Sequence, residues 1–181
     1  YASDIELLFL YEDDGATAGD RATSNHEYYE AFVRGARDAI TARQEGIFEL
    51  DLRLRPYGAK GALATSLRGF AEYYREHGPA EQFERMALVR LRPFTGSDHV
   101  RAEAVRRRDA WVYSGARLNI DEVLHLRRRQ ATELTRAGTV NAKYSPGAVV
   151  DLEYFVQALQ IEHGASHADV RAPGTLEGAE L

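Results

Sequence analysis

Two short segments near the start of the chain carry hydrophobic and polar residues in patterns typical of β-strands. Residues 4–11 are apolar on both faces from Leu7 to Leu10, which predicts a buried strand. Residues 47–55 alternate between apolar and charged side chains and stop at Pro56, which predicts a strand with one polar face. The segment between them has the spacing of a helix, so the strands can be neighbours in one small sheet.

Helical spacing of apolar residues dominates the rest of the chain, apart from a break at Pro93–Asp98. Strands and helices alternate before this break, and the pattern is helical beyond it, so we expect an α+β fold with a domain boundary near residue 95. The segment at 80–92 is compatible with a helix or a strand, and we favour the helix. The expected helices run from Ser24 or Asn25 to about Arg43, from Ser66 to about Gly78, and then over 99–113, 121–137 and 148–163.

Three carboxylates on the two predicted strands are the strongest candidates for chemistry. Asp4 and Glu6 project from the same face of the first strand, and Asp51 lies on the charged face of the second. If the strands are neighbours, these groups meet and repel each other unless cations lie between them. Mg²⁺ prefers oxygen ligands, and a pair of such ions supports phosphoryl or nucleotidyl transfer. The alternative is an ordinary solvated face, and the second charged strand favours the metal site over it.

Basic side chains near these acids offer two further roles. Arg53 and Arg55 share the expected face of Asp51, so one can offset its charge while the other grips a triphosphate through paired hydrogen bonds. The spacing leaves open which arginine serves which purpose. Lys143 lies in a loop that contains proline and glycine, and this favours contact between its ammonium group and phosphate.

Composition narrows the class of protein. The net charge of −5 argues against a nucleic-acid binder, and we expect the arginine runs at 106–108 and 127–129 to form solvated faces or intramolecular ion pairs. The chain has no cysteine, which excludes thiol catalysis and cysteine-ligated zinc and is compatible with the cytoplasm. No apolar run approaches the roughly 18 residues that span a bilayer, so we expect no membrane partner. A first residue that is Tyr rather than Met indicates a fragment of a longer protein.

Four segments, taken in order, resemble the glutamine synthetase adenylyltransferase family of polymerase-β-type nucleotidyltransferases. Residues 3–9, SDIELLF, are similar to the family's S-D-[IL]-D-L-I-F strand. Residues 49–58, ELDLRLRPYG, followed by Gly61, resemble its long and specific V-D-L-R-L-R-P-x-G-x-x-G block. Residues 83–92 and 141–157 resemble its W-E-[RH]-x-A-[LM] helix and its K-x-G-x-G-G segment.

The resemblance implies a nucleotidyltransferase core at 1–95, built from a small mixed sheet flanked by helices, and an all-helical bundle domain at 96–181. It implies an enzyme that transfers AMP from ATP to a tyrosine of glutamine synthetase, as part of nitrogen regulation, with two Mg²⁺ ions. The implied metal-binding and catalytic residues are Asp4, Glu6 and Asp51. The implied contacts to ATP are Ser3, Arg53, Arg55 and Lys143.

Departures from the family pattern keep alternatives open. Glu6 stands where the family has Asp, and its longer side chain moves the ligand oxygen by one methylene group. The Gly-Ser loop that holds the triphosphate in the family would lie before Tyr1, so the N-terminal part of the core is expected to be missing. Phosphate-dependent removal of AMP by the same type of site, and a non-catalytic binding or regulatory module, are the alternatives to AMP transfer.

Overall fold

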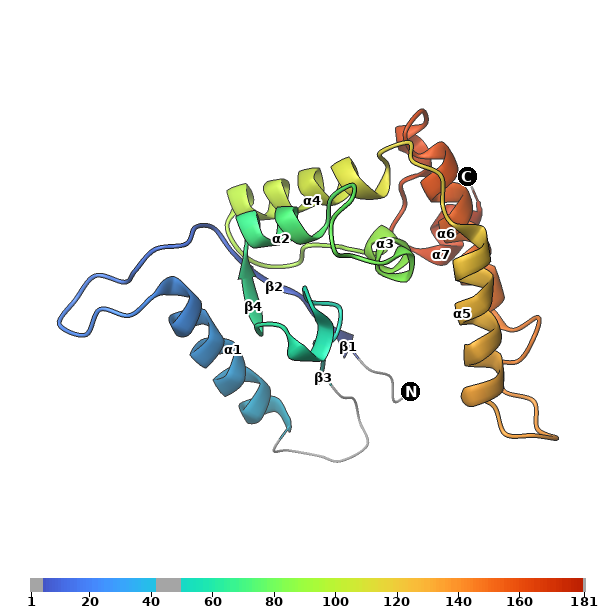
Figure 1. Cartoon of the computed structure of the whole chain (residues 1–181), viewed down its shortest axis with the longest axis horizontal. Helices are drawn as coiled ribbons and strands as arrows, with labels where there is room; N and C mark the ends of the chain where they lie inside the picture. Colours follow the sequence, from blue (N-terminus) through green and yellow to red (C-terminus); the bar gives the residue numbers. More distant parts are fainter. Residues whose placement is uncertain (1–4, 42–49, 181) are drawn as a thin grey trace. The chain divides into compact units, whose positions relative to one another are not determined.

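The computed structural model describes residues 5–41 and 50–180, and these residues form two compact units. The first unit comprises the residues up to Ala80 together with Pro93–Arg107, and the second comprises Glu81–Arg92 together with the residues from Arg108. All the described strands belong to the first unit (Figure 1). Across the described residues the chain is mixed α/β, with small parallel sheets and seven α-helices.

The strands of the first unit form two parallel pairs. β1 (Ile5–Glu6) pairs with β3 (Leu50–Asp51), and β2 (Phe9–Tyr11) pairs with β4 (Ala64–Ser66). Parallel neighbours require a long crossover connection between them. The segment between β2 and β3 contains such a crossover helix, α1 (Asn25–Thr41). The prediction that the two acidic segments are neighbouring strands is therefore confirmed for the residues that the structure describes.

The first predicted strand is interrupted. The pattern predicts one strand over 4–11, whereas the structure has β1 and β2 with Leu7 and Leu8 between them. The two short strands pair with different partners, and the amide N–H of Leu7 continues the contact by donating to the carbonyl of Asp51 at 2.9 Å. Because of this interruption, one segment contributes strands to two different strand pairs.

The second predicted strand was wrong beyond Asp51. The Asp51 carboxylate accepts a hydrogen bond from the backbone N–H of Arg53 at 2.8 Å, and the N–H of Arg55 donates to the carbonyl of Leu52. Local hydrogen bonds of this kind compete with a strand ladder and turn the chain. The alternating face expected for residues 52–55 therefore does not exist, and residues 47–49 lie outside the described part of the chain.

The crossover helix α1 begins at a capping box. The Ser24 hydroxyl accepts from the N–H of Glu27 at 3.1 Å, and the Glu27 carboxylate accepts from the N–H of Ser24 at 3.2 Å. Ser24 is thus confirmed as the start of the helix. Val33 is buried in this helix, whereas Tyr28 and Phe32 are exposed. Val33 belongs to a core cluster with residues from β2, β4 and the turn after β3, namely Tyr11, Ala64 and Leu52.

Ser66 caps the next helix, as predicted. Its hydroxyl accepts a hydrogen bond from the N–H of Gly69 at the start of α2 (Leu67–Tyr73), which buries Phe70 completely. The helix ends at Tyr73, earlier than the expected end near Gly78. Both α1 and α2 pack against β4, so helices cover the small sheet of the first unit (Figure 1).

Helices make up the second unit. The helix expected at 80–92 is confirmed as α3 (Gln82–Val89), which packs against α5 (Ile120–Glu133) and α6 (Val149–His163). A short helix, α7 (Thr175–Ala179), contacts α6 and lies in a tail for which no element was predicted. The helix α4 (Asp98–Val112) starts in the first unit and ends in the second.

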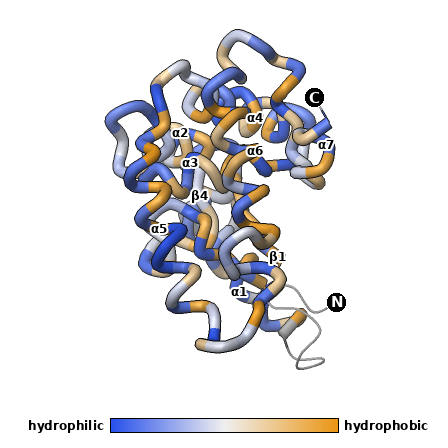
Figure 2. Tube along the Cα trace, turned by 90° about the vertical axis from the view of Figure 1, so that its right-hand side faces the viewer, coloured by the Kyte–Doolittle hydropathy of each residue, from blue (hydrophilic) through white to orange (hydrophobic). Residues whose placement is uncertain are grey.

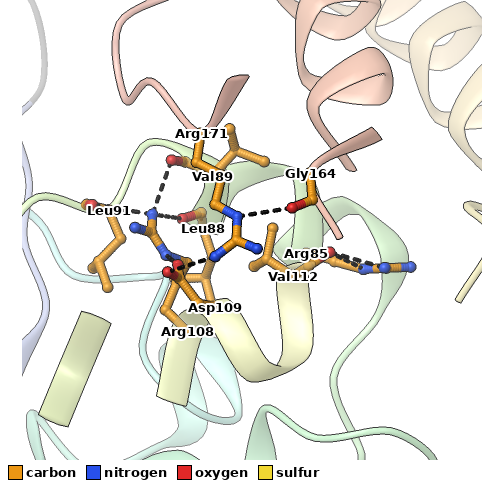
Figure 3. Close-up of polar contacts among 9 residues, drawn as sticks. All are labelled: Arg85, Leu88, Val89, Leu91, Arg108, Asp109, Val112, Gly164 and Arg171. Atoms are coloured by element: carbon orange, nitrogen blue, oxygen red, sulfur yellow. Dashed lines mark hydrogen bonds and ion pairs between the residues drawn. The ribbon is translucent and has the colours of Figure 1, made fainter. Parts of the chain in front are cut away.

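Arginine side chains, among them the buried Arg85 and Arg108, bind the backbone carbonyls at three helix ends (Figure 3). Arg108 donates to the carbonyls of Leu88, Val89 and Leu91 at the end of α3, at 3.0–3.2 Å. Arg85 donates to the carbonyl of Val112 at the end of α4, and Arg171 to that of Gly164 at the end of α6. Helix C-termini leave backbone carbonyls without intrahelical donors, so these guanidinium groups satisfy groups that would otherwise be buried alone.

The arginine runs form intramolecular ion pairs, as the sequence predicts. Arg106 and Arg107 both pair with Glu103, at 2.7 and 3.1 Å, and Arg129 pairs with Glu133. The hydrogen bonds from Arg106 are the main cause of a lowered pKa of about 2 at Glu103. Only part of each run is solvated, however, because Arg108 and Arg127 are buried.

No described helix combines the length and the apolar character that crossing a membrane would require. Hydrophilic residues are interspersed with hydrophobic ones along the labelled helices (Figure 2). The expected boundary at residue 95 stays a prediction about folding domains. The structure assigns α3 to the second unit and most of α4 to the first.

Candidate active site

The carboxylates of Glu6 and Asp51 are brought together by the pairing of β1 with β3. The parallel register sets Ile5 opposite Leu50 and Glu6 opposite Asp51. Residues directly opposite each other on neighbouring strands project from the same face of the sheet. Glu6 is exposed and Asp51 is partly buried, so an acidic pair lies at the solvent side of this strand pair.

Asp51 accepts hydrogen bonds from both the backbone and the side chain of Arg53. Its Oδ1 accepts from the backbone N–H at 2.8 Å, and its two oxygens accept from Nε of Arg53 at 3.0 and 2.9 Å. A further bond joins Nη2 of Arg53 to Oδ2 at 2.5 Å. These hydrogen bonds hold the pKa of Asp51 below its usual value, against the opposing effect of partial burial. At neutral pH the carboxylate is therefore ionised and paired with the guanidinium group of Arg53.

The third predicted carboxylate cannot be placed. Asp4, and Ser3 before it, lie outside the described residues, so the meeting of three acids stays a prediction. Within residues 5–41 and 50–180, no group of three or more acidic, histidine or cysteine side chains is arranged to hold a metal ion. The prediction for Asp4 rests on general strand geometry, in which residues two positions apart project from the same face.

Arg55 differs from Arg53 in its surroundings. It is buried, and its guanidinium donates to the backbone carbonyls of Leu52, Ala59 and Gly61 at 2.6–3.1 Å. These bonds close the turn that follows β3, so the observed geometry gives Arg55 a structural role. Contact between Arg55 and ATP stays a prediction.

Lys143 lies in a loop of the second unit whose backbone is held by hydrogen bonds with neighbouring side chains. The side chain of Asn141 accepts from the N–H groups of Lys143 and Tyr144, and Arg127 donates to the carbonyl of Tyr144 at 3.0 Å. Asp151, in the first turn of α6, pairs with Arg127, and this hydrogen bond is the main cause of its lowered pKa. The Lys143 ammonium is exposed and lies 5.1 Å from the centre of the Tyr144 ring. Its contact with phosphate stays a prediction.

Two conspicuous residues in the resembling helix have roles that the sequence analysis does not anticipate. Glu84 is buried and accepts from the N–H of Glu81, which completes the capping box of α3. Arg90 forms an ion pair with Glu153 of α6 at 3.4 Å. Glu81 and Glu84 have the spacing of a capping box, so that role could have been found, whereas nothing in the sequence pairs Arg90 with Glu153.

A cleft of about 530 Å³ in the first unit is a feature that no sequence pattern indicates. Its lining includes Asp14 and Arg68, which form an ion pair at 2.6 Å, and Ser66, whose hydroxyl donates to the same carboxylate at 3.3 Å. Tyr11 also donates to Asp14, at 3.3 Å. These four polar side chains thus bond to one another.

The described chain is thus a mixed α/β protein with carboxylates on adjacent parallel strands, and comparison with known proteins gives its family. The model of the family described as glutamate-ammonia ligase adenylyltransferase matches residues 1–107. The chain belongs to this family, which confirms the resemblance seen in its sequence motifs.

Curated relatives extend the similarity to nearly the whole chain. Proteins from Rhodopseudomonas palustris, Stenotrophomonas maltophilia and Caulobacter vibrioides are 31%, 34% and 33% identical over 99%, 96% and 93% of this chain. Each is named bifunctional glutamine synthetase adenylyltransferase/adenylyl-removing enzyme. The chain spans only 18–19% of the length of these relatives.

Proposed function

We propose that this chain carries the catalytic site of a nucleotidyltransferase that moves AMP from ATP to a tyrosine of glutamine synthetase. The observation that carries the proposal is the register of β1 and β3, which sets Glu6 directly opposite Asp51. The family membership and the names of the relatives supply the reaction and the protein substrate. We assign the strands and helices of residues 1–95 to a nucleotidyltransferase core and residues 96–181 to a helical domain.

The donor set fits divalent cations. Glu6 and Asp51 offer only carboxylate oxygens, which Mg²⁺ prefers, and Asp51 already binds a cationic group, the Arg53 guanidinium. Asp4, Glu6 and Asp51 would hold two Mg²⁺ ions. Bound there, the ions would lower the pKa of the attacking tyrosine hydroxyl and neutralise the phosphates of ATP.

The side chains of the chain itself supply the remaining steps. Asp51 is ionised, so it can accept the proton of the tyrosine hydroxyl as that oxygen attacks the α-phosphorus of ATP. The bond from the α-phosphorus to the bridging oxygen breaks, and pyrophosphate leaves. Arg53, which is exposed, and Lys143 would stabilise the negative charge of the leaving group, with Ser3 as a further contact to the nucleotide.

A second activity is supported by the names of the relatives. Each is described as an adenylyl-removing enzyme as well as an adenylyltransferase, so the same type of site can run phosphate-dependent removal of AMP. Inorganic phosphate would then attack the phosphorus of the AMP–tyrosine ester, the bond from this phosphorus to the tyrosine oxygen would break, and ADP and the reprotonated tyrosine would be released. A cytoplasmic location stays a prediction that rests on the lack of cysteine.

Transfer of labelled AMP tests the proposal. The full-length protein is incubated with glutamine synthetase and ATP labelled in its α-phosphate, either with Mg²⁺ or with excess EDTA. We expect label on glutamine synthetase only in the presence of Mg²⁺, because the carboxylates alone repel the triphosphate. Adenylylated glutamine synthetase, treated with and without phosphate, reports the removing activity. If neither reaction takes place, the chain is a non-catalytic binding module and the proposal is wrong. A reaction that proceeds equally well in excess EDTA would contradict the metal site.

A further inference from the structure

Arg53 and Asp51 differ sharply in exposure although they form a close ion pair. The side chain of Asp51 is 11% exposed, whereas that of Arg53 is 75% exposed. Arg53 therefore covers the carboxylate from the solvent side. Because the guanidinium itself is exposed, it can exchange its hydrogen bonds to Asp51 for hydrogen bonds to water when it leaves this position.

The carboxylate does not depend on the arginine side chain for its orientation. The backbone N–H of Arg53 also donates to Oδ1 of Asp51 at 2.8 Å, and this bond belongs to the turn that follows β3. When the guanidinium moves away, the amide remains and keeps the carboxylate in place. Neighbouring Arg55 cannot move in this way, because it is buried and bound to backbone carbonyls.

The guanidinium occupies the oxygens that a divalent ion needs. Hydrogen bonds from Nε and Nη2 engage both Oδ1 and Oδ2 of Asp51. A cation that binds these oxygens must displace Arg53, because two positive groups in that space repel each other. The displaced guanidinium keeps its charge and its fork of donors, which match the oxygens of a phosphate.

We propose that Arg53 is a displaceable cation that competes with the divalent ion for Asp51 and, once displaced, binds the phosphates of the nucleotide. This inference rests on the proposed function, because it assumes that Asp51 is a metal ligand. Metal and nucleotide then strengthen each other's binding. The metal releases Arg53 for the phosphates of the nucleotide, and the nucleotide binds the arginine that would otherwise compete with the metal for Asp51. Such coupling is reciprocal, so the nucleotide tightens metal binding by the factor by which the metal tightens nucleotide binding.

Titration with Mn²⁺ alone tests the competition. We expect Arg53→Gln to bind Mn²⁺ about tenfold more tightly than the parent chain, because the competing charge is gone. The same variant should lose most of the tightening that a non-hydrolysable ATP analogue gives the parent. Arg53→Lys, which retains charge without the fork, should lie between the two. Free Mn²⁺ is measured by electron paramagnetic resonance.

A matched control is Arg68→Gln. Arg68 pairs with Asp14 at 2.6 Å and its side chain is 73% exposed, so it resembles Arg53 in geometry but lies on another carboxylate. This variant should bind Mn²⁺ as the parent does. A direct spectroscopic signature comes from the ¹⁵N resonance of Arg53 Nε, assigned by its loss in Arg53→Gln. It should shift when Mg²⁺ is added without nucleotide.

The outcomes separate this inference from the proposed function. If Asp51→Asn weakens Mn²⁺ binding but Arg53→Gln leaves it unchanged, Asp51 is a ligand and the competition is wrong. An Arg53 resonance that ignores Mg²⁺ would overturn the inference in the same way. If Asp51→Asn leaves Mn²⁺ binding unchanged as well, the metal site of the proposed function fails together with the inference.

Discussion

Replacement of Asp51 by Asn is expected to reduce Mg²⁺-dependent AMP transfer by about a thousandfold or more while the fold is retained. The amide removes the negative charge that the ions and the tyrosine proton require, and it changes the shape of the side chain very little. The loss should appear in the turnover number, measured with labelled ATP and glutamine synthetase. Circular dichroism and urea unfolding should match those of the parent, because the lost ion pair with Arg53 is exposed on the arginine side.

Asp14→Asn is the matched control for this experiment. Asp14 also lies in the first unit and pairs with an exposed arginine, Arg68, yet it belongs to the loop after β2 and not to the β1–β3 pair. Its replacement should leave AMP transfer within about twofold of the parent rate, as expected for a substitution outside the site. Equal transfer rates for Asp51→Asn and Asp14→Asn would contradict the assignment of Asp51.

Arg108→Met is expected to lower the free energy of unfolding by about 3 kcal/mol. The methionine fills much of the space but donates no hydrogen bonds, so three backbone carbonyls at the end of α3 lose the donor that Arg108 provides (Figure 3). Asp109, which pairs with both Arg108 and Arg171, would keep only the pair with Arg171 of the two. Urea unfolding followed by circular dichroism measures the change.

The control for Arg108 lies two residues earlier on the same helix. Arg106 is exposed and pairs with Glu103 on the surface, so Arg106→Met should change the free energy of unfolding by less than about 0.5 kcal/mol. The two variants make the same substitution in the same helix and differ in burial. A loss as small for Arg108 as for Arg106 would show that the buried guanidinium does not stabilise the second unit.

Strand pairing was predictable because it follows from a repeating pattern. The patterns of the two acidic segments predict strands whose carboxylates meet if the strands are neighbours, and the pairing that sets Glu6 opposite Asp51 confirms that they are neighbours. Caps were predictable for a similar reason, since Ser24 and Ser66 stand directly before apolar helical spacing. These features depend on residues close in sequence or on a period of two.

The turn after Asp51 was not predictable from the alternation of residues 47–55. An Asp side chain that binds the next N–H groups competes with the ladder, and the pattern of faces does not reveal which of the two wins. Arg55 was placed on the charged face for the same reason, whereas it turns inward to backbone carbonyls. The burial of Arg108 and Arg127 depends on carbonyls far along the chain, which a local pattern cannot contain.

The sequence predicts those residues of the candidate site that lie on the two strands. Glu6 and Asp51 are where the pattern places them, and Arg53 takes the charge-offsetting role that spacing left undecided. Asp4 and Ser3 lie outside the described residues, and Lys143 belongs to the second unit. Their parts in the site therefore remain predictions that rest on the family resemblance.

The most direct test of the central claim is the number of Mn²⁺ ions that the chain binds in the presence of a non-hydrolysable ATP analogue. If carboxylates from both strands bind shared ions, the parent chain should bind two Mn²⁺ ions, after subtraction of the metal bound to free nucleotide. For Asp51→Asn, they predict the loss of at least one ion or a clear weakening of its binding. The same number of ions bound with the same affinity by the parent and by Asp51→Asn would contradict the account.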